Sequence, residues 1–380
     1  MPEEDFPVRK LAFLLLLVGF CQSAMAATSV TVDQLEQMLT SLHNQRDEKI
    51  AEKLTGLELT ERVTSARLAK WEADFTGKES RDALVGLSDA AAFLNLPAAD
   101  IPTIEMPDPA TRKKILMQTI EYVKTTIHKV PPCSARRSTT HFEDKPKDYE
   151  SRVLHLSANG AGGNGMTADT VGFGSIASGT KVLHVLDRST LVSTYRDGLE
   201  EAHKGSGWKA GPKNLGLSTT GEFGPILTTV VGDAIRGQIR WGRWEQGAAG
   251  PIAVLLYSVP QEISHYALSV GAAVGKSGQP QAPTYHGEIA VDPATGNILR
   301  LTIETELKPP HEVFDSSIEL EYGPVSLGNA TYICPIKGVA LSKVSYPSED
   351  PKSQAPTAPP QIFMNDVSFT EFGAVADAHK

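Results

Sequence analysis

The sequence predicts an α+β protein: a helical N-terminal region followed by a curved antiparallel sheet or open β-barrel with one short helix. Between residues 27 and 131, apolar residues recur at helical spacing, which indicates helices packed through one face. After Cys133 the pattern changes to alternating and β-branched runs separated by Gly, Asp and Pro, which is typical of short strands joined by turns. Pro131 and Pro132 separate the two patterns, because proline does not continue a helix.

The clearest helix of the region 27–131 begins at Asp108 and Pro109, a capping residue followed by proline at the first helical position. Leu116, Ile120 and Val123 then follow at helical spacing. The same spacing predicts further helices over residues 32–54, 59–75 and 84–94. We expect their apolar stripes to be core or helix-packing surfaces rather than ligand sites.

Residues 132–346 are predicted to form an antiparallel β domain of about ten short strands, a meander that curls into a barrel-like sheet. The sequence Asp292-Pro293-Ala294-Thr295-Gly296 predicts the turn of one hairpin. One short helix, from Glu222 to about Ile235, is expected to interrupt the strands and cover part of the sheet.

Two segments complete the predicted organisation. Residues 347–361 hold five prolines and few apolar side chains, which predicts a flexible loop. Residues 362–380 follow as a final strand and tail.

The N-terminus has the order of features found in secretory signals. Arg9 and Lys10 precede an apolar run, Leu11–Phe20, and small residues stand at the cleavage positions before Ala27. The run is too short to span a bilayer as a helix. We therefore expect a signal peptide over residues 1–26, cleavage between Ala26 and Ala27, and a secreted or periplasmic protein with no transmembrane segment in the mature chain.

Charge limits the possible partners. The net charge of −9 gives no electrostatic reason to bind nucleic acid or an anionic membrane surface. Three cysteines are present, and Cys21 would leave with the signal peptide. The remaining pair, Cys133 and Cys334, forms either one disulfide, as an oxidising compartment allows, or two separate buried thiols.

No sequence motif indicates a cofactor or a metal. Gly160, Gly162 and Gly165 fit G-x-G-x-x-G, but the glycines that follow exclude the helix that this nucleotide-binding motif requires. The histidines lack the spacing of metal ligands, and G-x-S-x-G and H-E-x-x-H are absent. We expect no cofactor and no metal site, and the sequence leaves any catalytic residues unknown.

The best candidate for ligand contact is a short basic and aromatic run that includes Trp241, Arg243 and Trp244. Arginine beside tryptophan on a strand can stack on a flat ligand. The same pattern also covers the open end of a barrel, so both interpretations stay open.

Several segments resemble a group of uncharacterised secreted proteins known mainly from acidobacteria. The resemblance lies in LTGLELTERVTSARLAKWEADF and ALVGLSDAAAFLNLP in the helical region, and in YHGEIAVDPATGNILRLTIE and IELEYGPVSLGNATYICPI in the β region. The group has no established reaction, so membership implies no activity. The hairpin around Asp292–Gly296 is also similar to that of periplasmic lipoprotein-carrier proteins, whose half-barrel sheet shelters acyl chains.

The sequence thus favours a non-enzymatic secreted or periplasmic binding protein for an apolar or amphipathic cell-envelope component, with a lipid or an envelope protein as partner. The alternatives are a secreted hydrolase of unknown class and a protein-interaction adaptor. An apolar pocket on the concave face of the sheet would favour the binder, and a His–acid pair converging in a cleft would favour the enzyme.

Overall fold

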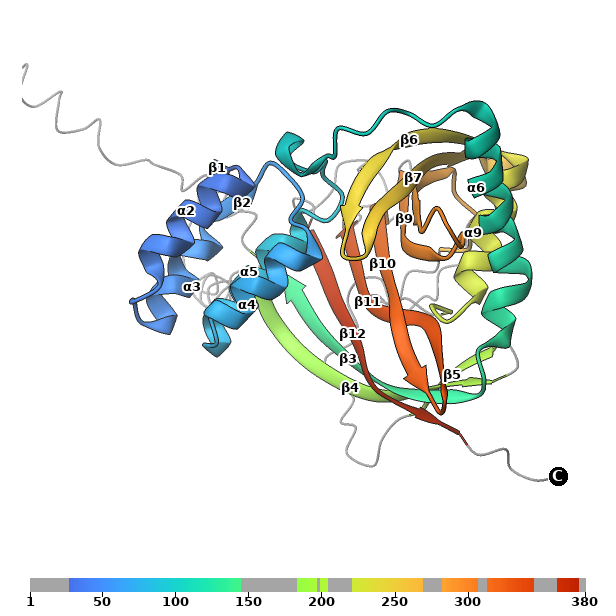
Figure 1. The fold of residues 1–380 in the computed structure, drawn as a ribbon. Helices are drawn as coiled ribbons and strands as arrows, with labels where there is room; N and C mark the ends of the chain where they lie inside the picture. The colour runs from blue at the N-terminus through green and yellow to red at the C-terminus, as the bar shows by residue number, and fades with distance from the viewer. Residues whose placement is uncertain are drawn as a thin grey trace, which may run out of the picture.

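The computed structural model describes residues 27–144, 183–196, 199–203, 221–268, 282–306, 313–344 and 361–375. The predicted signal peptide 1–26, with Ala26, and all but the last residue of the predicted loop 347–361 lie outside these residues. Within them the fold mixes helices with one large antiparallel sheet (Figure 1).

Six α-helices are described: α2 (Val32–Leu42), α3 (Asp47–Thr55), α4 (Ser65–Asp74), α5 (Lys78–Ala90), α6 (Pro109–Glu121) and α9 (Pro225–Arg236). Asp108 caps α6, because its carboxylate accepts the backbone N–H groups of Ala110 and Thr111. The region 27–131 is not purely helical, contrary to expectation, since β1 (Thr28–Val30) and β2 (Leu57–Leu59) pair in parallel within it.

The large sheet has ten strands in the order β5-β4-β3-β12-β11-β10-β9-β8-β7-β6. Their bounds are β3 (Cys133–Glu143), β4 (His184–Arg196), β5 (Leu199–His203), β6 (Gln238–Gly247), β7 (Gly250–Val259), β8 (Tyr285–Val291), β9 (Ile298–Glu306), β10 (Val313–Leu327), β11 (Ala330–Val344) and β12 (Gln361–Ala374). All neighbouring pairs are antiparallel. The predicted antiparallel sheet is confirmed, whereas the alternative of a β-barrel was wrong, because β5 and β6 are edges that do not pair with each other and the sheet stays open.

Helices α6 and α9 pack on the concave face of the sheet, over strands β6 to β11 (Figure 1). Val230 of α9 and Ile115 of α6 are buried against strand residues that include Leu255 and Leu320. The expected helix at 222–235 is α9, but α6 shares the concave face with it. The surface predicted to be left for a guest is therefore a packed core.

A second hydrophobic core lies among the N-terminal helices. Its members run from Val30 to Ala91 and include Trp71 and Leu84. We call residues 28–91 the helical unit. Because Ile115 belongs to the core of the sheet, the two cores divide the chain between Ala91 and Ile115, upstream of the change in sequence pattern at Pro131.

Cys133 and Cys334 are both buried free thiols, so the predicted disulfide is not formed. Cys133 is on β3 and Cys334 on β11, and β12 lies between these strands. Strands that are second neighbours lie about 9.5 Å apart, whereas a disulfide joins Cα atoms less than about 7 Å apart. Burial raises the pKa of the Cys133 thiol to about 11 and that of Cys334 to about 12.

The turn between β8 and β9 packs against α6 and requires glycine. Gly296 has φ of +77°, and a Cβ there would lie 2.3 Å from the carbonyl carbon of Gln118. Gly328 also has positive φ, +62°, but nothing lies within 4 Å of its Cβ position.

We expect Gly328→Ala to lower the free energy of unfolding by about 1–2 kcal/mol through its backbone conformation alone. Gly296→Ala should cost at least about 2 kcal/mol more, because α6 must shift. Urea denaturation measures both, and equal losses would contradict the packing described.

Candidate functional site

The helical unit contacts the outer face of the sheet, the face opposite α6 and α9 (Figure 1). This contact combines an apolar cluster, in which Val85 of α5 packs against Phe142, Val339 and Met364 of the sheet, with several ion pairs. Its centre is a buried network of three arginines and three glutamates: Arg62, Arg243, Arg300, Glu245, Glu288 and Glu319. Arg62 is the one member from the helical unit, and the other five belong to β6, β8, β9 and β10.

Glu245 is the hub of this network. Its two carboxylate oxygens each accept a hydrogen bond of 2.8 Å from Nη2 of Arg62 and one of 3.1 Å from Nη2 of Arg300. Arg243 also pairs with Glu245 and binds Glu288 through both terminal nitrogens, at 2.6 and 2.9 Å. Each charge therefore has an opposite charge beside it, which a buried charge requires.

The arginines decide which acids in the network are ionised. Burial alone would raise the pKa of Glu245, but the charges of Arg300, Arg62 and Arg243 outweigh it and lower the pKa to about 2. Glu319 is less well paired, with Arg300 at 3.4 Å, and burial raises its pKa to about 7.

A second electrostatic contact joins α5 to the sheet. The Lys337 ammonium on β11 binds the buried carboxylate of Asp89 on α5. Burial raises the pKa of Asp89 to about 7, the charge of Lys337 opposes this rise, and the nearby Asp366 adds to it. Phe142 on β3 lies against Gly86, so α5 also has apolar contact with the sheet.

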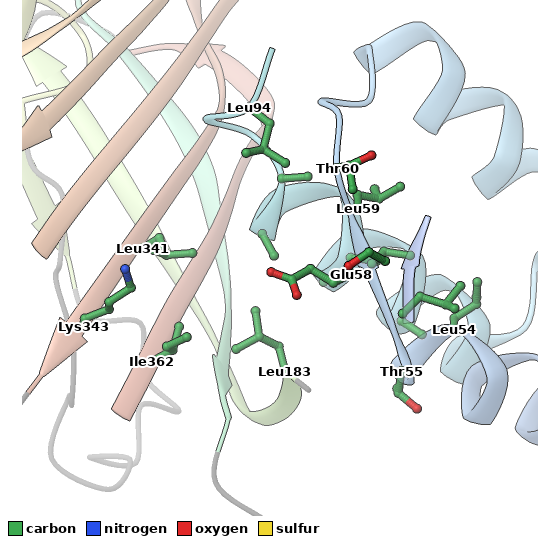
Figure 2. Close-up of a pocket in the computed structure, with 17 residues that line it drawn as sticks. Leu54, Thr55, Glu58, Leu59, Thr60, Leu94, Leu183, Leu341, Lys343 and Ile362 are labelled. Carbon is green, nitrogen blue, oxygen red and sulfur yellow. The ribbon is translucent and has the colours of Figure 1, made fainter. Parts of the chain in front are cut away.

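A cleft of about 450 Å³ lies where α3, β2 and α5 face β11 and β12 (Figure 2). We call it the apolar cleft, because most of its lining is aliphatic: Leu54, Leu57, Leu59, Ala83, Leu87, Ala90, Ala91, Leu94, Leu183, Leu341 and Ile362. Leu94 is 40% exposed, so apolar surface reaches solvent there. Glu58 and Lys343 add opposite charges to the lining, and the Glu58 carboxylate points across the cleft toward the sheet (Figure 2).

A second, polar cleft of about 340 Å³ opens on the same outer face over β6 to β9. Its polar lining residues are Gln238, Arg240, Ser258, His286, Glu288 and Glu304. Glu288 belongs also to the buried network, so the polar cleft and the arginine network are contiguous.

The structure brings the predicted ligand residues Trp241 and Trp244 together, with ring centroids 4.9 Å apart, but packs them against the concave core. A bulge at Gly242 turns both rings to this face and Arg243 to the other. The indole N–H of Trp244 donates to the carbonyl oxygen of Glu105, and Arg243 binds Glu288. A ligand role for these three residues stays a prediction, although each is already engaged within the protein.

The sequence analysis missed the residues that join the helical unit to the large sheet. Arg62 and Glu245 are 183 positions apart, and no spacing rule connects them. Two histidines that sequence could not pair also have acidic neighbours. Nδ1 of His265 is 2.6 Å from Oδ1 of Asp233, and His286 stands opposite Glu304. The sequence did contain one signal for these pairs, namely charged residues at alternate positions of β8 and β9.

Comparison with protein families, curated proteins and solved structures finds no significant match to this chain. Among the residues that the structure describes, no helix combines the length and apolar character needed to cross a bilayer. Within the same residues, no group of three or more His, Cys, Asp or Glu side chains could hold a metal ion.

Removing Arg62 should destabilise the protein strongly. Arg62→Ala leaves the buried carboxylate of Glu245 short of one partner, and breaking a buried pair costs about 3–5 kcal/mol. The matched control is Arg136→Ala, which removes an exposed pair with Glu371 and should cost less than about 1 kcal/mol. Urea denaturation measures the free energy of unfolding of both variants. Similar losses would show that the Arg62 network stabilises the protein no more than an exposed ion pair does.

Glu319 should make stability fall as pH rises toward 7. Its pKa is about 7 when folded and about 4.3 when unfolded, so the folded state binds the extra proton between these values. The contribution of Glu319 to the free energy of unfolding therefore falls from pH 4.5 to 7 and is constant above pH 7. Glu319→Gln should remove on the order of 2–3 kcal/mol of this decline. Urea titrations at pH 4.5, 6 and 7.5 test it, with the exposed Glu371→Gln as control; parallel curves for wild type and Glu319→Gln would contradict the assignment.

Proposed function

We propose that this protein is a secreted or periplasmic binding protein for an amphipathic cell-envelope molecule, and that the apolar cleft holds the apolar chain of that molecule. The observation that carries the proposal is the aliphatic lining of the cleft, which is shared between the core of the helical unit and an apolar cluster on the outer face of the sheet. The site differs from the concave face that the sequence suggested, because α6 and α9 already occupy that face.

The size and lining of the apolar cleft suit a single chain. Its volume of about 450 Å³ falls in the range of about 300–1,000 Å³ usual for small-molecule sites. Each methylene group that enters an apolar site gains about 0.8 kcal/mol, so ten would gain about 8 kcal/mol before the costs of association.

The polar lining supports an amphipathic ligand over a purely apolar one. Glu58 and Lys343 contribute a carboxylate and an ammonium to the same cleft. Lys343 binds Asp315 at 2.7 Å, and both side chains are part-exposed, so this pair can exchange with a polar ligand group at low cost. The chain would lie against Leu87 and Leu341, with its polar end near Lys343.

A fluorescent amphiphile tests the site. We expect the full chain to bind 11-(dansylamino)undecanoic acid with a rise in dansyl emission. Leu94→Glu places a charge in the apolar lining, and Ala90→Phe fills the exposed edge of the cleft without adding charge. Each should raise Kd at least about tenfold, a loss of about 1.4 kcal/mol.

Met117→Glu is the matched control, because Met117 is an exposed apolar side chain on α6, and α6 contributes no residue to the cleft. It should leave Kd unchanged. An unchanged Kd in both cleft variants, or no binding of the probe to the wild-type chain, would refute the proposed site.

A further inference from the structure

Strand register places a serine, a histidine and a glutamate in one row on the outer face of the sheet. Ser258 on β7 stands opposite His286 on β8, and His286 stands opposite Glu304 on β9. Directly opposite residues have Cβ atoms about 4.5–5.5 Å apart. All three line the polar cleft, whereas their neighbours Val259 and Tyr285 are buried in the concave core.

The sheet is locally irregular beside this row. The pairing of β8 with β9 covers Tyr285 and His286, skips Gly287 and Glu288, and resumes at Ile289. The backbone N–H of Glu288 donates instead to the hydroxyl of Thr302, at 2.9 Å. A Cβ at Gly287 would lie 2.1 Å from the carbonyl oxygen of Thr302, so only glycine fits. The register is the same on both sides of this gap, so the gap leaves the row in place, and the register shift of the strand pair lies between Ala290 and Val291.

His286 and Glu304 interact electrostatically across the strand pair. Burial raises the pKa of Glu304, while His286 opposite it acts to lower it, and Glu288 acts to raise it. Arg240 and Gln238 bring N–H donors to the same cleft.

We propose that Ser258, His286 and Glu304 form a nucleophilic site that hydrolyses small carboxylic esters in the polar cleft. The order serine, histidine, acid is the one that acyl transfer requires. Hydrogen bonds among such groups commonly tighten only when substrate binds. This activity does not depend on ligand binding in the apolar cleft.

In the first step Oγ of Ser258 attacks the ester carbonyl carbon, and its proton passes to His286. Glu304, a positioning residue, holds the imidazolium, and Arg240 or Gln238 donates to the oxyanion. The bond from carbon to the alcohol oxygen then breaks, and the alcohol leaves with the proton from His286. In the second step solvent water gives a proton to His286 and its oxygen attacks the acyl carbon. The acyl–Ser258 bond breaks, and the proton returns to Ser258 as the carboxylic acid departs.

A fluorophosphonate probe tests the nucleophile directly, because it modifies activated serines. The full chain should gain the mass of one probe, and peptide mapping should place it on Ser258. Ser258→Ala should abolish the label and lower hydrolysis of p-nitrophenyl acetate by about 10³-fold or more. Ser326→Ala is the control, because Ser326 is an exposed strand serine opposite Thr331, and it should change neither.

Kinetic measurements distinguish a role of His286 and Glu304 in the reaction from a merely structural role. His286→Ala should remove labelling as fully as Ser258→Ala. Glu304→Gln should lower kcat with little change in KM, and Glu304→Asp, which keeps the carboxylate, should retain more of the kcat. Ser258 and His286 are exposed, so near-ultraviolet circular dichroism of their variants should match wild type. Absence of label on Ser258, or hydrolysis unchanged in Ser258→Ala, would overturn the proposal.

Discussion

Arg62 reaches from the loop between β2 and α4 into the outer face of the sheet, where its guanidinium meets Glu245 and Glu319. Above pH 7, where Glu319 is ionised, the network without Arg62 would hold two arginines against three glutamates and leave one negative charge uncompensated. With it, the formal charges balance. Charge compensation at Arg62, the ion pair of Asp89 with Lys337 and the apolar cluster around Phe142 together hold the helical unit on the sheet.

The two faces of the sheet are stabilised by different physics. Apolar packing of α6 and α9 on the concave face leaves a filled core. On the outer face, ion pairs and a small apolar cluster join the helical unit to the sheet and leave the apolar cleft between them. The polar cleft lies on the same face but is lined by strands β6 to β9 alone.

Local patterns in the sequence predicted local structure well. The cap at Asp108 and the turn Asp292–Gly296 are formed as expected. The predictions that failed depended on the order of the strands in the sheet and on single-residue shifts in strand register. Periodicity does not reveal that β12 separates Cys133 from Cys334, nor that a bulge at Gly242 turns Trp241 and Trp244 into the core. Of the candidate sites, the sequence suggested only the kind of ligand, because both clefts are made from segments far apart in the chain.

We propose that an amphipathic molecule binds between the helical unit and the sheet. Photo-crosslinking of the full chain with a diazirine-bearing fatty acid, followed by peptide mapping, tests it most directly. We expect adducts between Ala83 on α5 and Leu94 shortly after it, and on Leu341 or Ile362 across the cleft. Excess unlabelled fatty acid should remove them. Adducts confined to other surfaces, such as α6, or adducts that excess fatty acid does not compete away, would contradict it.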